Sequence, residues 1–273
     1  MDPPTGGSLS FCTARTCLHS RALNAAVLEF AAMASELVQV SFKRPFPVFV
    51  LPHVALLPHA LVQLFIFEPR YTQMMSDILD TSGQFAMAVC DGDCVLQDNP
   101  PIRSTVCLGQ IVRHVRNDNG TFHVWVRGLC RARVVAEQLP TDLAAPEGRL
   151  YRTARLEPLE EEDASERDLA FIRADLMDLL HTEPLRDVGA FKAVVEQIEA
   201  QDEEVPTPAL VDIVSLSLLS VMDDFDLRYQ LLSQGGVFER ARTLQGQLRA
   251  LRAPLAQAER QYDPDAPKGV SWN

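Results

Sequence analysis

The sequence predicts an α+β protein in which a β domain precedes a C-terminal α-helical bundle. Between residues 41 and 158, short apolar runs alternate with Gly, Pro and Asn, which is typical of strands and tight turns. From residue 169 to 260, apolar residues recur at spacings of three and four, as on the buried face of a helix. The formal charge agrees with two domains, because −11 of the total of −12 falls in residues 158–260.

Composition divides the chain into five segments. The first segment is rich in Ser, Thr, Gly and Pro, and we interpret it as disordered or as the product of an upstream start, with Met33 as the true first residue. The segments are an N-terminal extension (1–40), the β domain (41–158), an acidic linker (159–168), the helical bundle (169–260) and a C-terminal tail (261–273).

Seven stretches of the β domain are suited to strands because they are apolar and rich in β-branched and aromatic residues. They are FPVFVL (46–51), ALVQLFIF (60–67), QFAMAVC (84–90), TVCLGQIVRHV (105–115), TFHVWVRGL (121–129), CRARVVAEQL (130–139) and LYRTARLEPL (150–159). The pair Asn119-Gly120 favours the positive φ values of a tight hairpin turn between the fourth and fifth stretches.

A strand-to-helix corner is predicted at IFEPRY (66–71). Pro69 suits the first turn of a helix, where its missing N–H is no loss, and Glu68 suits the positive end of that helix. We expect Glu68 and Arg70 to form an ion pair that fixes the corner, and the helix after it to close one opening of a β barrel. With Glu68 buried, Arg70→Ala is expected to cost about 3–5 kcal/mol.

The bundle is predicted to contain helices over 169–179, 188–198, 207–221, 223–233 and 237–255. The last has the most regular pattern, with Val237, Ala241, Leu244, Leu248, Leu251 and Leu255 at alternating spacings of four and three. Two interpretations fit this stripe: a homodimer formed through the helix 237–255, or ordinary packing within the bundle.

The sequence lacks the motifs of several enzyme classes. None of the three lysines follows a glycine, so no P-loop exists, and the patterns G-x-S-x-G, H-E-x-x-H and G-x-G-x-x-G after a strand do not occur. We therefore predict no catalytic residue, no cofactor and no enzyme activity. No apolar run reaches the roughly 20 residues of a membrane span, and we predict a cytoplasmic protein.

A metal site is the weaker alternative for the cysteines. Cys90, Cys94, Cys107 and Cys130 could bring four thiolates together, but the second closely spaced pair of a zinc site is missing. We expect them to be reduced thiols that act as small apolar side chains. His53 and His59 lie in loops with no acidic partner nearby. No metal site is predicted.

A strip of arginines is the candidate binding surface. Arg127, Arg131 and Arg133, with Arg113 across the hairpin and Trp125 between them, are predicted on one sheet face. They are either solvated strand residues or a surface for acidic peptide or RNA. The acidic net charge disfavours nucleic acid.

The sequence resembles the N-terminal domain of Lon proteases, which also occurs as a free-standing module and in cereblon. The first strand pair FPVFVLPHVALLPHALVQLFIF, the hexapeptide with Glu68, Pro69, Arg70 and Tyr71, and the tripeptide Gly109-Gln110-Ile111 carry the resemblance. Gly120, Gly128 and the closing segment from Tyr151 to Glu160 complete it. The resemblance implies a PUA-like β barrel followed by a helical bundle, which recognises protein substrates and has no catalytic residues.

The predicted function is thus a non-catalytic module that binds unfolded or extended polypeptide segments, in a groove between barrel and helices. Its partners would be polypeptide substrates or a protease or chaperone for which it serves as an adaptor or accessory. With the chain ending at Asn273, the ATPase and peptidase segments of Lon are not expected in it. The alternative is an RNA- or ligand-binding PUA-like module that uses Arg113, Arg127, Arg131 and Arg133.

Overall fold

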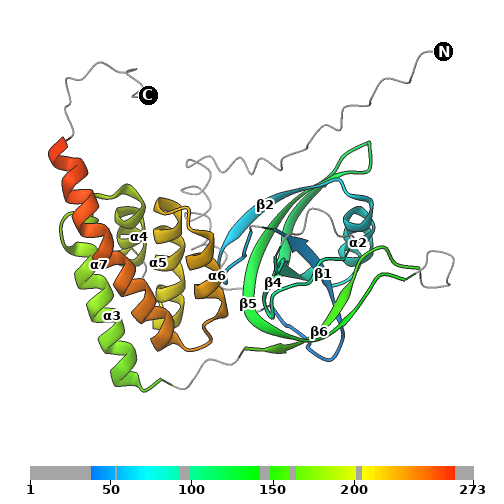
Figure 1. Ribbon diagram of the computed structural model, residues 1–273, viewed down its shortest axis with the longest axis horizontal. Helices are drawn as coiled ribbons and strands as arrows, with labels where there is room; N and C mark the ends of the chain where they lie inside the picture. Colours follow the sequence, from blue (N-terminus) through cyan, green and yellow to red (C-terminus); the bar gives the residue numbers. More distant parts are fainter. Residues whose placement is uncertain are drawn as a thin grey trace, which may run out of the picture.

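The computed structural model describes residues 38–52, 54–92, 99–141, 148–159, 164–200 and 205–261. Within them lie six strands followed, apart from one early helix, by a run of helices (Figure 1). The predicted α+β class, with its C-terminal helical region, is confirmed. Most of the expected N-terminal extension, the acidic centre of the linker and the C-terminal tail lie outside the described residues.

The six strands form one sheet with the order β2-β5-β4-β3-β1-β6, and β5 also pairs with β6. Five strands therefore close a ring, while β2 stands outside it and is bonded to β5. The strands are β1 (Phe46–Leu51), β2 (Leu61–Ile66), β3 (Gln84–Val89), β4 (Thr105–Arg116), β5 (Phe122–Gln138) and β6 (Thr153–Pro158).

Strand β5 differs from its prediction. The sequence suggests separate strands over 121–129 and 130–139, but the structure has one strand of 17 residues. Gly109 of β4 faces Gly128, whereas the preceding Leu108 faces Cys130, so Leu129 has no residue opposite it. Such a β-bulge reverses the faces to which the following side chains point.

The sheet separates two apolar cores. Strand β3 is buried on both faces: Phe85, Met87 and Val89 join a large cluster that extends into α2 and the bundle. Ala86 and Ala88 join a smaller cluster between β1, β4, β5 and β6. The large side chains thus face the helices and the small ones face the narrower interior of the ring.

Helix α2 (Pro69–Leu79) packs on the large core on the side of the β domain away from the bundle (Figure 1). Tyr71, Met74, Met75 and Ile78 recur at helical spacing and are buried. Pro69 occupies the first turn as predicted, and Glu68 is the N-cap residue in extended conformation.

The bundle is built around α5. Helix α5 packs against α3, α4 and α7, and its sequence is apolar almost throughout. The elements are α3 (Glu166–His181), a 3₁₀ turn η1 (Leu185–Asp187), α4 (Gly189–Glu199), α5 (Thr207–Val221), α6 (Phe225–Ser233) and α7 (Val237–Gln261).

The regular apolar stripe of α7 lies inside this bundle. Val237, Ala241, Leu244 and Leu248 are buried in the large core, and Leu251 and Leu255 pack against it. The chain therefore uses this stripe for its own packing. A homodimer through the helix 237–255 stays a prediction, and the apolar stripe that suggested it is already covered by the bundle. Across the described residues, no helix combines the length and apolarity that membrane crossing requires.

Candidate functional site

Exposed aromatic side chains gather on the outer surface of β2, β5 and β4. Phe65 and Phe67 are 51% and 53% exposed, and Val115 is 43% exposed. Phe65 and Val115 both lie opposite His123, on either side of β5. We call Phe65, Phe67, Val115, His123 and Trp125 the aromatic face. Clustering of large exposed apolar residues is a feature of binding surfaces in soluble proteins.

The rings of this face contact one another instead of packing into the core. Phe65 stacks on Phe67 with 5.8 Å between ring centroids, and its ring lies 4.8 Å from the His123 ring. In the next row of the sheet, Trp125 lies between Gln63 and Arg113, and the Arg113 guanidinium is 4.8 Å from the Trp125 ring. The face therefore offers apolar contact area with a cation beside it.

The predicted arginine strip is divided by the bulge in β5. Arg113 and Arg127 lie on the same sheet face as Trp125. Beyond the bulge, Arg131 pairs with Cys107 on the opposite face, and Arg133 follows on that opposite face. Arg131 is 6% exposed and is not a surface residue. A continuous strip does not form, because the extra residue Leu129 turns the following side chains to the other face. The sequence gives little sign of this bulge.

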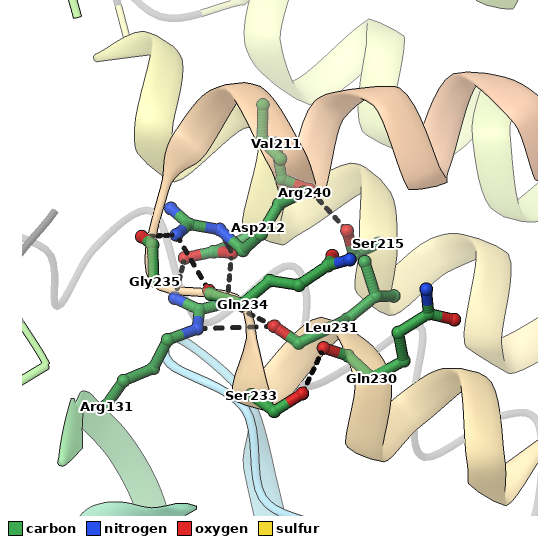
Figure 2. A network of polar contacts seen from close by, with 10 residues as sticks. All are labelled: Arg131, Val211, Asp212, Ser215, Gln230, Leu231, Ser233, Gln234, Gly235 and Arg240. Atoms are coloured by element: carbon green, nitrogen blue, oxygen red, sulfur yellow. Dashed lines mark hydrogen bonds and ion pairs between the residues drawn. The ribbon is translucent and has the colours of Figure 1, made fainter. Parts of the chain in front are cut away.

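Arg131 instead belongs to a buried charged network at the junction of β domain and bundle, shown in Figure 2. Its guanidinium donates two hydrogen bonds to the carboxylate of Asp212 in α5, at 3.0 and 2.7 Å. Arg240 of α7 approaches the same carboxylate at 3.3 Å. Sequence reasoning missed Asp212, although a single acidic residue in the apolar run LVDIVSLSLL is a signal for a buried ion pair.

Two arginines on one carboxylate leave a positive charge in the interior, and the end of α6 balances it. Arg131 donates to the carbonyl of Leu231 at 3.3 Å, and Arg240 donates to the carbonyls of Gln234 and Gly235 (Figure 2). These carbonyls lie at the C-terminus of a helix, where they lack helical partners and carry partial negative charge. The network thus joins β5, α5, α6 and α7.

Helix α6 also contacts β4 directly. The Arg103 guanidinium lies 4.5 Å from the Tyr229 ring, and the Thr105 N–H donates to the Tyr229 hydroxyl at 3.3 Å. At this contact the junction is closed by packed side chains. The groove expected between barrel and helices is therefore not open here, and the aromatic face is the better candidate for a binding surface.

The thiols offer no metal site in the described part of the chain. Cys90 is disulfide-bonded, so the expectation of reduced thiols is wrong for this residue. Cys107 and Cys130 are free, and burial raises the pKa of the Cys107 thiol. No group of three His, Cys, Asp or Glu side chains is placed to bind a metal among the residues described. His53 and Cys94 lie outside them.

The sequence matches the family of ATP-dependent protease La (LON) substrate-binding domains over residues 45–250. The chain belongs to this family. The resemblance drawn from IFEPRY and the glycines is confirmed.

A solved structure shows the same fold as this LON domain. The N-terminal domain of a Mycobacterium avium complex Lon protease matches with a TM-score of 0.51 and 20% identity, over 76% of this chain and 98% of that one. A Lon N-terminal domain protein from Xanthomonas campestris matches with a TM-score of 0.43 and 18% identity, over 74% and 96%. No curated protein matches the sequence significantly.

The corner formed by IFEPRY in this LON domain holds the end of β2, which carries part of the aromatic face. Arg70 binds Glu68 at 2.7 Å, and its guanidinium lies 4.7 Å from the Tyr71 ring. The Tyr71 hydroxyl lies 3.2 Å from both backbone groups of Val50 in β1, and burial raises its pKa. The corner thereby ties the end of β2, and with it Phe67, to β1, which is not its neighbour in the sheet.

The ion pair at this corner is more exposed than expected. The side chains of Arg70 and Glu68 are 37% and 41% exposed, so water screens the charges. The estimate of 3–5 kcal/mol for Arg70→Ala is too large, because it assumed that Glu68 is buried.

The signature glycines have separate structural reasons. A Cβ at Gly128 would lie 2.0 Å from the carbonyl oxygen of Leu57, and one at Gly109 would lie 2.6 Å from the Val126 side chain. Gly120 has a φ of +81° in the hairpin turn, which L-residues rarely adopt. Gly128 therefore allows the chain before β2 to lie directly on the β4–β5 ribbon, and Gly109 leaves room for the Val126 side chain.

Proposed function

We propose that this LON substrate-binding domain is a non-catalytic module that binds unfolded polypeptide segments through the aromatic face. The observation that carries the proposal is the exposure of Phe65 and Phe67 on a fold whose family is defined by substrate binding. Apolar side chains that are buried in a folded protein become available when that protein unfolds. A face of exposed rings therefore binds the unfolded form of a protein in preference to its folded form, because only the unfolded form offers it apolar contact area.

The test uses a fluorescently labelled probe protein that has been unfolded by reduction and carboxymethylation. The wild-type chain and two variants are each titrated into this probe, and binding is measured as fluorescence anisotropy. The double variant Phe65→Ser/Phe67→Ser is expected to bind at least about tenfold more weakly, since aromatic anchors dominate binding energies. The control is Phe171→Ser, which removes an exposed ring, 66% exposed, from α3 in the bundle. Equal affinity of all three proteins would contradict the proposal, as would equal binding of the folded, oxidised probe.

Salt dependence separates this function from the RNA-binding alternative. Arg113 and Arg127 remain together beside Trp125, which favours a π-stacked, phosphate-bearing ligand. Binding of single-stranded RNA would weaken steeply with salt, with a slope of about −0.7 for each phosphate neutralised. We expect the unfolded protein to bind with little dependence on salt and RNA to bind poorly, because only two of the four predicted arginines share this face.

Roles in proteolysis and in the cytoplasm are further parts of the proposal. A module that holds unfolded chains suits an adaptor or accessory to a protease or chaperone. We expect the purified chain to cleave neither casein nor ATP, and turnover of either would overturn the non-catalytic assignment. Localisation is tested with the tagged protein in cells, and its exclusion from the cytoplasm would overturn that part of the proposal.

A further inference from the structure

Strand β2 has one bonded neighbour, whereas every other strand of the described sheet has two or more. The N–H of Gly128 donates to the carbonyl of Ala60 at 2.9 Å, so the Ala60 carbonyl faces inward across the β2–β5 ladder. Antiparallel strands alternate the direction of their backbone groups residue by residue. Val62, Leu64 and Ile66 therefore turn their N–H and C=O groups toward β5, and Leu61, Gln63 and Phe65 turn theirs to the outer edge.

No strand in the described part of the chain pairs with this outer edge. Edge strands of soluble proteins are normally protected by charged residues, proline or a bulge. The sequence of β2, LVQLFI, contains none of these, and its register with β5 is unbroken. The nearest charged residues along the chain, Glu68 and Arg70, lie beyond its end and bind one another. The edge is thus left able to accept another strand.

The unprotected edge and the aromatic face meet on the same residues. Along a strand, side chains and backbone groups alternate with the same period of two. The residues whose backbone faces the edge are consequently those whose side chains lie on the outer face: Gln63 is exposed, and Phe65 is 51% exposed and stacked on Phe67. A strand added beside β2 would lie next to these two rings.

We infer that β2 binds its ligand by strand addition: an extended polypeptide pairs its backbone with Leu61, Gln63 and Phe65 and sets alternate apolar side chains against Phe65 and Phe67. This inference rests on the proposed function and specifies the form of its substrate. Backbone pairing tolerates many sequences, and it requires a segment whose own backbone groups are unpaired. Unfolded chains meet this requirement, whereas the backbone groups of a folded protein are already paired.

The first test uses the wild-type chain and a labelled ten-residue peptide with Phe and Val at alternate positions, Ser between them and Glu at both ends. Each backbone amide of the peptide is N-methylated in turn, which removes one donor. Strand addition predicts a period of two: methylation at every second position weakens binding at least tenfold, and methylation at the positions between changes it less than twofold. A flat profile would overturn the inference.

The second test changes the protein edge. In Gln63→Pro the lost N–H faces outward, so the ladder to β5 is retained, and proline is tolerated at such edge positions. We expect at least tenfold weaker binding with an unchanged circular dichroism spectrum, whereas the control Gln63→Ala binds as the wild type does. Wild-type affinity of Gln63→Pro would overturn the inference; if this variant does not fold, the N-methylation profile decides alone.

Failure of the inference is distinguishable from failure of the proposed function. If Phe65→Ser/Phe67→Ser abolishes binding while Gln63→Pro and N-methylation have no effect, the aromatic face stands and strand addition falls. If the wild-type chain binds neither peptide nor unfolded protein, the proposed function falls with it. A wild-type dimer in sedimentation that Gln63→Pro converts to monomer would assign the edge to a second copy of the chain, and would also overturn the inference.

Discussion

The corner of IFEPRY and the junction of the β domain and the bundle both contain arginine–carboxylate pairs, but in different surroundings. At the corner, Arg70 and Glu68 are 37% and 41% exposed, and the two residues are neighbours in sequence. At the junction, the side chains of Arg131 and Asp212 are each 5% exposed and that of Arg240 is fully buried, and the partners come from distant elements. The more recognisable motif therefore contains the more exposed ion pair, and the inconspicuous Asp212 binds arginines from both the β domain and the bundle.

The largest effect is expected for Asp212→Asn. The substitution keeps the shape of the side chain but leaves Arg131 and Arg240 without their carboxylate in the interior. Loss of one partner of a buried ion pair costs about 3–5 kcal/mol, and we expect this decrease in the free energy of unfolding from urea denaturation. Asp175→Asn, which breaks the exposed pair with Arg249, is the control and should cost less than about 1 kcal/mol. Equal stabilities of the two variants would remove the distinction between junction and surface.

A smaller effect is expected for Arg70→Ala. It removes a screened ion pair and the contact of the guanidinium with the Tyr71 ring, together about 1 kcal/mol of unfolding free energy. Because the pair is exposed, the difference between variant and wild type should shrink in 1 M NaCl. A loss as large as that of Asp212→Asn would show that the corner is buried in solution.

The smallest effect is a pH dependence at the end of α3. The pKa of His181 is raised above its ordinary 6.5 by the hydrogen bond that it donates to the Met177 carbonyl and by Glu199 at 3.2 Å. A raised pKa means that protonated His181 stabilises the fold below the unfolded pKa, and that this contribution disappears as pH rises through the folded value. The difference in Tm between wild type and His181→Gln should therefore be larger at pH 5.5 than at pH 8.5. A difference that does not change with pH would contradict this assignment.

Much of the fold could be predicted because its signals are local. The Asn119-Gly120 turn, Pro69 at a helix start and the alternation around Phe122 and Val124 each depend on a few adjacent residues. The bulge at Leu129 could not be predicted, because it depends on which residue of β4 lies opposite. The division of the arginines between two faces follows from that bulge.

The aromatic face also depends on information that the sequence lacks. LVQLFIF is apolar on both faces, so its pattern does not say which side is exposed. Phe65 is exposed because β2 is an edge strand outside the closed ring, which is a property of the sheet order. The apolar stripe of α7 shows the converse. Its sequence is compatible with binding a second chain, yet in the structure it packs against α3 and α5.

The measurement that tests the central claim most directly is hydrogen–deuterium exchange of the wild-type chain with and without a bound unfolded polypeptide. We expect binding to slow exchange in β2 and in the adjoining residues 122–127 of β5, and to leave α3 unchanged. Protection confined to the bundle or to the junction around Asp212, with none in β2, would contradict it.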